Sequence, residues 1–242
     1  MTRKKHDQLF NTFVMRPVAA VAVAGLAGTS VTPNQVTLAN FAVFLVAAAL
    51  LVLWPSWAGG VAAAFVLEVS YCLDCADGML ARYKGLASKT GHLLDFFTDE
   101  IKAILLVASL SVRAWRVGGL GVFLQPWERS DPRFLLGGIA GAVVVSSAIS
   151  LTNFVRRPEL SGRETTVEAF YETSEAAPTT WSRRRASWWV TTFLRWVNHY
   201  PSHIWLWALV GRMEVYLWVY VVLNALYLAR GWVGLALRFG RG

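Results

Sequence analysis

Long apolar stretches separated by short polar segments make up most of this sequence. A helix that crosses a lipid bilayer needs about 20 consecutive apolar residues, and six stretches are candidates for such helices. They cover residues 34–54, 56–82, 91–114, 134–155, 201–212 and 215–227. The pattern therefore predicts an all-α integral membrane protein with six transmembrane helices, of which the fifth is short for a full span.

The first of these stretches begins and ends with clear signals. Thr32 suits the N-cap position, because its hydroxyl can accept a hydrogen bond from a backbone N–H that the first helical turn leaves free. Pro33 suits the first turn itself, where the missing N–H costs nothing. Pro55 follows the last apolar residue and predicts the end of the helix there.

Segments outside the apolar stretches complete the predicted architecture. Residues 9–15 form an amphipathic segment, and the apolar stretch 17–27 that follows is short and lies too far from the start for a cleaved signal peptide. We expect residues 1–30 to include an interfacial amphipathic helix on the cytoplasmic surface. The polar segment 156–187 indicates a cytoplasmic loop. Residues 1–242 are expected to form a single membrane-embedded domain.

The balance of charged and apolar residues supports a membrane location. Hydrophobic residues make up 55% of the 242 residues and charged residues 16%, whereas a soluble domain usually has about 25% charged residues. The formal net charge of +8 could serve nucleic-acid binding. In a chain this apolar it more often reflects basic loops that contact anionic lipid, so we expect membrane lipids and no nucleic acid as partners.

The basic residues also predict an orientation. With the N-terminus inside, the cytoplasmic segments hold sixteen Lys and Arg residues and the outer segments hold five. Basic residues accumulate on the cytoplasmic side of membrane proteins. We therefore expect a multi-pass protein of the cell (inner) membrane with both termini in the cytoplasm.

Four aspartates lie in or against the second and third apolar stretches: Asp74, Asp77, Asp95 and Asp99. A charged side chain at membrane depth costs at least a few kcal/mol, so bound cations or an aqueous cavity should compensate these carboxylates. Each pair shares one side of its helix. If residues 82–91 form a tight hairpin, the two pairs converge, and four carboxylates suit two divalent cations, Mg²⁺ or Mn²⁺.

Small residues and one arginine lie close to the aspartates in the sequence. Gly78 and Ala81 lie on the same side of the second helix as Asp74 and Asp77, which would let a ligand approach the backbone closely. Arg82 is placed to bind a phosphate through its guanidinium. Gly91 could provide similar room at the start of the third helix.

These residues form one pattern with fixed spacing, D-x-x-D-G-x-x-A-R, eight residues, then G-x-x-x-D-x-x-x-D. The eight fixed positions are Asp74, Asp77, Gly78, Ala81, Arg82, Gly91, Asp95 and Asp99. The pattern resembles the signature of the CDP-alcohol phosphotransferases at every position and interval. Residues 32–37 are similar to the entry to that family's first membrane helix, so the resemblance covers residues 30 to 100.

The resemblance implies roles for these residues. In such an enzyme Asp74, Asp77 and Asp95 would bind two metal ions, and Asp99 would share in coordination and act as general base on the acceptor hydroxyl. The residues implied to line the CDP site are Gly78, Ala81, Arg82 and Gly91, with Asn34 and Thr37 as further nucleotide contacts.

The same resemblance implies an activity. Such an enzyme transfers a substituted phosphate group from a CDP-alcohol, for example CDP-diacylglycerol, to an alcohol acceptor with release of CMP, at the cytoplasmic side of the membrane and in phospholipid or related synthesis. It also implies six helices after an interfacial helix, and a homodimer.

The acceptor side is less well defined by the sequence. If the acceptor carries a phosphate, cationic side chains should hold it, and the candidates are Lys102, Arg156, Arg157 and Arg195. Their positions are equally typical of basic residues on the cytoplasmic side. Many members of the family carry a basic residue after the last aspartate, whereas this chain has Glu100. That difference argues against an inositol phosphate or glycerol phosphate acceptor. Glu68, in the second stretch, has no explanation from the pattern.

A cation transporter or channel that uses the same aspartates is the alternative hypothesis. Such a protein should place polar or acidic residues at the middle of several membrane helices. Here the carboxylates of the pattern concentrate where the second helix ends and the third begins. That distribution favours the enzyme.

Overall fold

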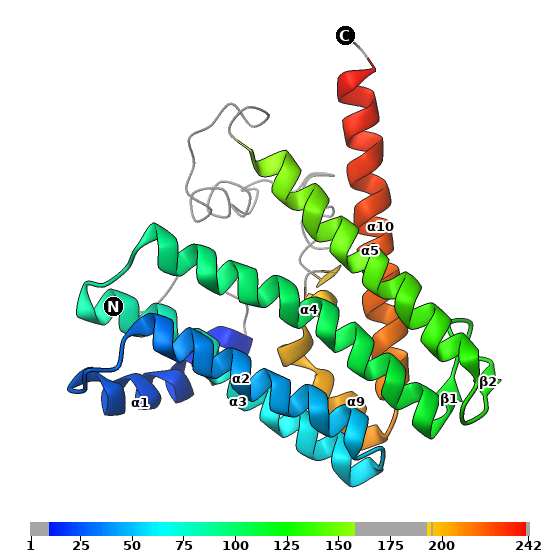
Figure 1. Cartoon of the computed structure of the whole chain (residues 1–242), viewed down its shortest axis with the longest axis horizontal. Coiled ribbons are helices and arrows are strands. Elements are labelled where there is room, and N and C mark those ends of the chain that lie inside the picture. The colour runs from blue at the N-terminus through cyan, green and yellow to red at the C-terminus, as the bar shows by residue number, and fades with distance from the viewer. Residues whose placement is uncertain (1–9, 158–192, 195, 241–242) are drawn as a thin grey trace, which may run out of the picture.

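The computed structural model of the chain describes residues 10–157, 193–194 and 196–240. The described part is almost entirely helical (Figure 1). Its elements are a π-helical turn η1 (Asn11–Met15), α1 (Arg16–Ala27), α2 (Pro33–Leu53), α3 (Trp57–Lys84), α4 (Lys89–Val117), β1 (Gly119–Leu120), β2 (Pro126–Trp127), α5 (Pro132–Arg156), a 3-10 turn η2 (Tyr200–Ser202), α9 (Ile204–Val210) and α10 (Met213–Phe239). The expected loop 156–187 and Arg195 lie largely outside the described residues.

Among the residues that the structure describes, four helices are long and apolar enough to cross a membrane, namely α2, α3, α5 and α10. The third expected transmembrane helix, 91–114, corresponds to α4, which has 29 residues and is about 43 Å long at 1.5 Å per residue. It falls outside that group because Asp95, Asp99, Glu100 and Lys102 lower the hydropathy of its first half. The chain is therefore an all-α membrane protein with four helices that meet both criteria.

The expectation of six transmembrane helices is not confirmed. The stretch 201–212 begins with the 3-10 turn around Pro201 and continues as α9, which has seven residues and is only about 10 Å long. Gly211 ends α9 in the left-handed conformation, with φ of 71°. The predicted fifth helix is thus too short to cross a bilayer.

Local signals fix the ends of the helices that carry the aspartates. At the start of α2, the Thr32 hydroxyl accepts a hydrogen bond from the Gln35 N–H at 3.3 Å, and the Gln35 side chain accepts one from the Thr32 N–H at 2.9 Å. This capping box confirms the predicted N-cap. Gly85, with φ of 68°, ends α3, and the Ser88 hydroxyl accepts from the Gly91 N–H at 3.0 Å to start α4. Only residues 85–88 join the two helices, so the predicted tight hairpin is confirmed.

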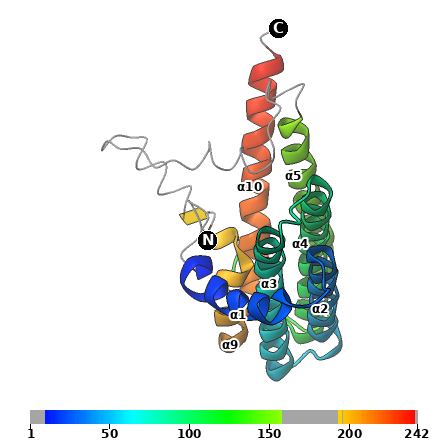
Figure 2. The same cartoon turned by 90° about the vertical axis from the view of Figure 1, so that its left-hand side faces the viewer.

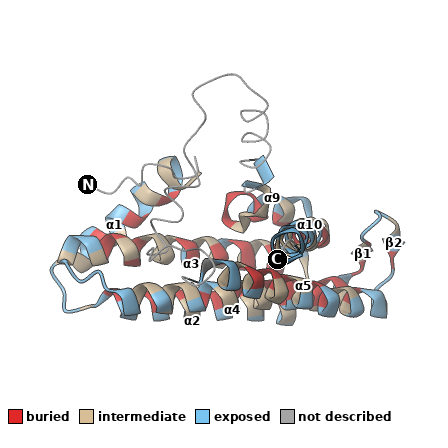
Figure 3. Cartoon of the chain, turned by 90° about the horizontal axis from the view of Figure 1, so that it is seen from above, coloured by how far each residue is buried: buried red, intermediate tan, exposed pale blue. Residues whose placement is uncertain are grey.

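The helices pack around one main apolar core. In Figures 1 and 2, α2 and α3 run side by side, α4 lies against α2 and α5, and α10 packs on α5. Fully buried members of the core come from all of these helices: Phe44, Leu67, Leu106, Phe134 and Tyr216. Figure 3 shows the buried residues between the helices and the exposed ones toward the outside, including the end of α10 nearest the C-terminus. The buried residues of α10 all lie between Met213 and Tyr220.

The N-terminal helix α1 packs on the first half of the aspartate hairpin. Ala19 and Val23 of α1 are buried against Ala76 and Leu80 of α3 in a second, smaller core. Val21 on the opposite side is 74% exposed, so α1 is apolar on both faces. The expected amphipathic interfacial helix is therefore not confirmed for α1.

Candidate active site

The α3–α4 hairpin brings together aspartates that are far apart in sequence. Asp74 of α3 and Asp95 and Asp99 of α4 each offer a carboxylate oxygen, and these oxygens lie within 4.8 Å of one another. Divalent cations bind oxygen ligands at about 2.0 to 2.6 Å, so oxygens this close can share one ion. The three aspartates are called the carboxylate cluster below. Its donor set suits Mg²⁺ or Mn²⁺.

Asp77 lies next to this cluster but has a different environment. Its side chain is buried, with 5% of the residue exposed, and it accepts a hydrogen bond from the Thr37 hydroxyl at 2.6 Å. Asp77 is not part of the three-aspartate group that the described residues form. The structure thus brings three of the four predicted ligands together, and it ties Thr37 to Asp77 instead of leaving it free for a nucleotide.

Lys102 lies between two members of the carboxylate cluster, Asp74 and Asp99. Its ammonium lies 2.8 Å from Asp74 Oδ1 and 2.6 Å from Asp99 Oδ1, and only 3% of the residue is exposed. A buried ammonium between two carboxylates compensates their charge directly. The sequence analysis had placed Lys102 among possible acceptor contacts, whereas the structure places it among the aspartates.

Two polar residues that the sequence analysis missed orient Asp74. The Asn40 side-chain amide donates a hydrogen bond to Asp74 Oδ1 at 2.9 Å, and the Ser70 hydroxyl donates to Asn40 Oδ1 at 2.5 Å. Both Asn40 and Ser70 are fully buried. A polar residue inside an otherwise apolar stretch, as Asn40 is, was the available signal.

The residues predicted to contact the nucleotide lie at the connected end of the hairpin, close to residues 85–88. A Cβ atom at Gly91 would lie 2.9 Å from Asn34 Oδ1, so the start of α2 rests closely on the start of α4. Arg82 is exposed, and its guanidinium lies beside Gly78, 3.6 Å from where a Cβ would be. Ala81, which directly precedes Arg82, is partly buried. Gly78 therefore leaves room beside the Arg82 guanidinium, whereas Asn34 fills the space beside Gly91.

The remaining predicted acceptor contacts do not meet at the cluster. Arg157 is exposed at the end of α5. The side chain of Arg156 and all of Arg195 lie outside the described residues. Glu100 has a structural partner, because the Asn153 side-chain amide donates a hydrogen bond to Glu100 Oε1 at 2.7 Å and so joins α4 to α5.

The comparison with known families decides the assignment. A family model for CDP-alcohol phosphatidyltransferases matches residues 30–157, which is more than half of the chain. The chain belongs to the CDP-alcohol phosphatidyltransferase family. No curated protein matches the chain. The match covers α2 to α5 and includes the whole carboxylate cluster.

Membership of the CDP-alcohol phosphatidyltransferases confirms the resemblance of the aspartate pattern. The family consists of membrane transferases of phospholipid biosynthesis that move phosphoalcohol groups from a CDP-alcohol, and it uses divalent metal. In this chain, the carboxylate cluster is where such a metal could bind.

Glu68 is not a member of the carboxylate cluster, and its burial predicts an effect on the stability of the fold. Both of its carboxylate oxygens are buried without a hydrogen-bond partner among the described residues. A buried polar group without a partner costs about 1 to 3 kcal/mol. We therefore expect Glu68→Leu to raise the melting temperature of the detergent-purified protein. The matched control is Glu100→Leu, which leaves the Asn153 amide without its acceptor and should lower it. Equal melting temperatures for the two variants would contradict this interpretation.

Proposed function

We propose that this chain transfers a substituted phosphate group from a CDP-alcohol, such as CDP-diacylglycerol, to an alcohol acceptor in a metal-dependent reaction that releases CMP. One observation carries the proposal: carboxylates from both arms of the hairpin, Asp74 on one side and Asp95 and Asp99 on the other, lie within 4.8 Å of one another. In this family, such a cluster is the natural place for metal-assisted phosphoryl transfer.

The proposed cofactor is a pair of Mg²⁺ or Mn²⁺ ions held by the carboxylate cluster together with Asp77. Ions bound there would neutralise negative charge on the diphosphate and on the departing CMP. Asn40 and Ser70 support this role, because their hydrogen bonds fix the direction of the Asp74 carboxylate.

Asp99 is the proposed general base. Its side chain is 50% exposed, more than that of Asp74 at 20%, so an acceptor hydroxyl can reach it. Asp99 takes the hydroxyl proton while the acceptor oxygen bonds to the β-phosphorus of the donor. The bond from that phosphorus to the CMP oxygen breaks, and both electrons leave with CMP. Displacement is direct, with no covalent intermediate on the enzyme.

The nucleotide is proposed to bind at the connected end of the hairpin, near residues 85–88. Arg82 contacts a phosphate, and Gly78, Ala81 and Gly91 let the ligand approach the helices. Asn34 lies beside Gly91 and is suited to contact the nucleotide, with Thr37 as a more remote contributor. Arg156, Arg157 and Arg195 remain the candidates for a phosphate on the acceptor. Lys102 is less suited to that role because Asp74 and Asp99 already bind it.

A substrate screen tests the reaction class. Purified full-length protein is incubated with CDP-diacylglycerol, CDP-choline, CDP-ethanolamine or CDP-inositol, each with alcohol acceptors, and both CMP and the mass of the product are measured. We expect CMP release from one donor with Mg²⁺ or Mn²⁺ and none with EDTA. Cation flux into vesicles without CMP release from any donor would instead support the transporter hypothesis.

We further propose that the protein lies in the cell membrane as a homodimer with both termini and the site in the cytoplasm. The distribution of Lys and Arg supports this orientation. A membrane-impermeant maleimide should label Phe123→Cys, in the β1–β2 hairpin, on intact cells, and Ser88→Cys, between α3 and α4, only after permeabilisation. The reverse labelling would contradict the orientation, and a monomer in native mass spectrometry would contradict the dimer.

A further inference from the structure

Four arginines gather at the end of the helices that lies away from the carboxylate cluster. They come from the end of α4 and from the segment that leads into α5: Arg113, Arg116, Arg129 and Arg133. Arg116 is 17 residues after Asp99 on the same helix, or about 25 Å along its axis. Basic residues are expected to be sparse on the outer side of a membrane protein, so these arginines need a specific explanation.

Two of the arginines have a structural role at the end of α2. Arg113 donates hydrogen bonds to the carbonyl oxygens of Trp54 and Ser56, at 3.3 and 2.7 Å, and Arg116 donates one to the carbonyl of Val52. The last carbonyls of a helix have no partner within the helix. Arg113 and Arg116 supply partners, and their positive charge suits the negative end of the helix dipole.

A third arginine, Arg133, is paired within its own loop. Its guanidinium donates to both oxygens of Asp131, at 3.0 and 2.5 Å, and lies over the Trp127 ring at 4.6 Å. Hydrogen bonds from Arg133 hold the pKa of the Asp131 carboxyl below its usual range. The charge of Arg133 is therefore largely neutralised.

Arg129 differs from the other three. It is exposed, and it makes no ion pair or side-chain hydrogen bond with another residue in the described part of the chain. Its neighbour Ser130 is held by a hydrogen bond from its own N–H to the Trp115 carbonyl at 2.7 Å and has a φ of 65°. The loop that carries Arg129 is thus tied to the end of α4.

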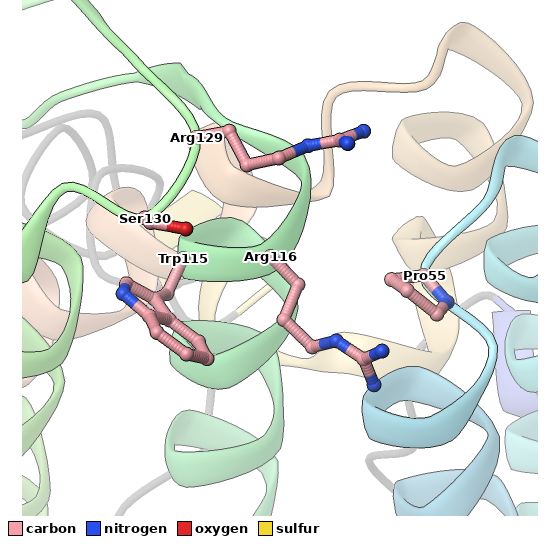
Figure 4. A pocket seen from close by; sticks show the side chains of 5 residues that line it. All are labelled: Pro55, Trp115, Arg116, Arg129 and Ser130. Atoms are coloured by element: carbon pink, nitrogen blue, oxygen red, sulfur yellow. The ribbon is translucent and has the colours of Figure 1, made fainter.

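Arg129 and Arg116 line the same hollow. The hollow has a volume of about 280 Å³ and is lined by Pro55, Trp115, Arg116, Arg129 and Ser130. Figure 4 shows the Arg116 side chain extending from α4 toward the loop that contains Pro55, and the Arg129 side chain extending from the loop between β2 and α5. Arg129 offers five N–H donors, Arg116 offers those that the Val52 carbonyl does not use, and Ser130 adds a hydroxyl, so the hollow suits an anion.

We propose that this hollow binds the phosphodiester headgroup of an anionic phospholipid on the leaflet opposite the carboxylate cluster. Two guanidiniums and a hydroxyl match the oxygens of a phosphodiester. Leu53 and Trp57, which lie two residues before and after the lining residue Pro55, are strongly exposed at 73% and 58% and are suited to contact acyl chains. Ligand pockets for whole small molecules usually exceed about 300 Å³, so this one suits a headgroup.

Native mass spectrometry of the full-length protein tests the proposal. The protein is purified in detergent and mixed with dioleoyl phosphatidylglycerol or dioleoyl phosphatidylcholine, and retained lipid is measured for wild type, Arg129→Gln and Arg133→Gln. A basic residue near a membrane surface contributes enough to change binding of anionic lipid about fivefold. We expect Arg129→Gln to retain about fivefold less phosphatidylglycerol than wild type, Arg133→Gln to resemble wild type, and phosphatidylcholine to bind all three weakly and equally.

Two results of the mass spectrometry would overturn the proposal. One is unchanged retention of phosphatidylglycerol by Arg129→Gln, and the other is an equal loss in Arg133→Gln, which would indicate a diffuse attraction to positive charge. Thermal unfolding with inorganic phosphate distinguishes the source of the anion. Stabilisation of wild type by phosphatidylglycerol but not by phosphate supports a lipid ligand. Equal stabilisation by phosphate would show that a free anion is the ligand and would overturn the lipid assignment.

Discussion

Asp99→Asn is expected to lower the rate of CMP release by about 10³-fold, since a positioned general base typically contributes 10² to 10⁴ in rate. Asparagine keeps the size of the side chain but cannot take the acceptor proton. It also removes one carboxylate from a cluster whose oxygens lie within 4.8 Å, so metal binding should weaken as well. The measurement is CMP release from the donor identified in the substrate screen, at saturating Mg²⁺.

The neighbouring residue provides a matched control for Asp99→Asn. Glu100→Gln neutralises a carboxylate one position along α4 that is bonded to Asn153 and lies outside the carboxylate cluster. It should keep activity within a few-fold of wild type and should fold equally well. If Asp99→Asn retained wild-type activity, the general base would have to be another residue, and the proposed mechanism would be wrong.

Lys102→Met should have the largest effect on the stability of the metal-free protein. The substitution keeps the length of the side chain but leaves Asp74 and Asp99 facing each other without the ammonium that lies 2.8 and 2.6 Å from them. Removing one partner of a buried ion pair costs about 3 to 5 kcal/mol. Thermal unfolding in EDTA should therefore show a clear drop in melting temperature relative to wild type.

The same variant should respond more strongly to divalent metal. In wild type the Lys102 ammonium occupies oxygens that a divalent ion also needs, so the two compete. Without it, half-maximal stabilisation should need about tenfold less Mg²⁺, which corresponds to roughly 1.4 kcal/mol. Lys84→Met is the matched control, because Lys84 donates only to the backbone carbonyls of Thr29 and Val31. An unchanged Mg²⁺ dependence in Lys102→Met would show that Lys102 and the metal do not compete.

The sequence predicted features that depend on local signals. The N-cap at Thr32 and the hairpin between α3 and α4 were predictable because capping residues and short polar connections act within a few positions of each other. The aspartate pattern indicated the family for the same reason, since its spacing places Asp74 against Asp95 and Asp99 once the hairpin forms.

Features that depend on packing between distant helices were not predictable. The ion pair between Lys102 and Asp74 forms only once α3 and α4 are placed in space. The hydrogen bonds that link Ser70 to Asn40, and Asn40 to Asp74, likewise need α2 and α3 to be packed together. Asp77 differs from the other aspartates only because Thr37 of α2 faces it. Apolar composition also could not reveal that α9 stops at Gly211 after seven residues, because lipid-facing and protein-facing apolar residues look alike.

The connection of residues 85–88 joins α3 to α4, with Gly85 and Ser88 fixing the last turn of one helix and the first turn of the other. A connection this short keeps the start of α4 close to the end of α3, because each residue of chain can span only about 3.5 Å. We therefore expect the spacing between Asp74 and the pair Asp95 and Asp99 to change little when donor and acceptor bind.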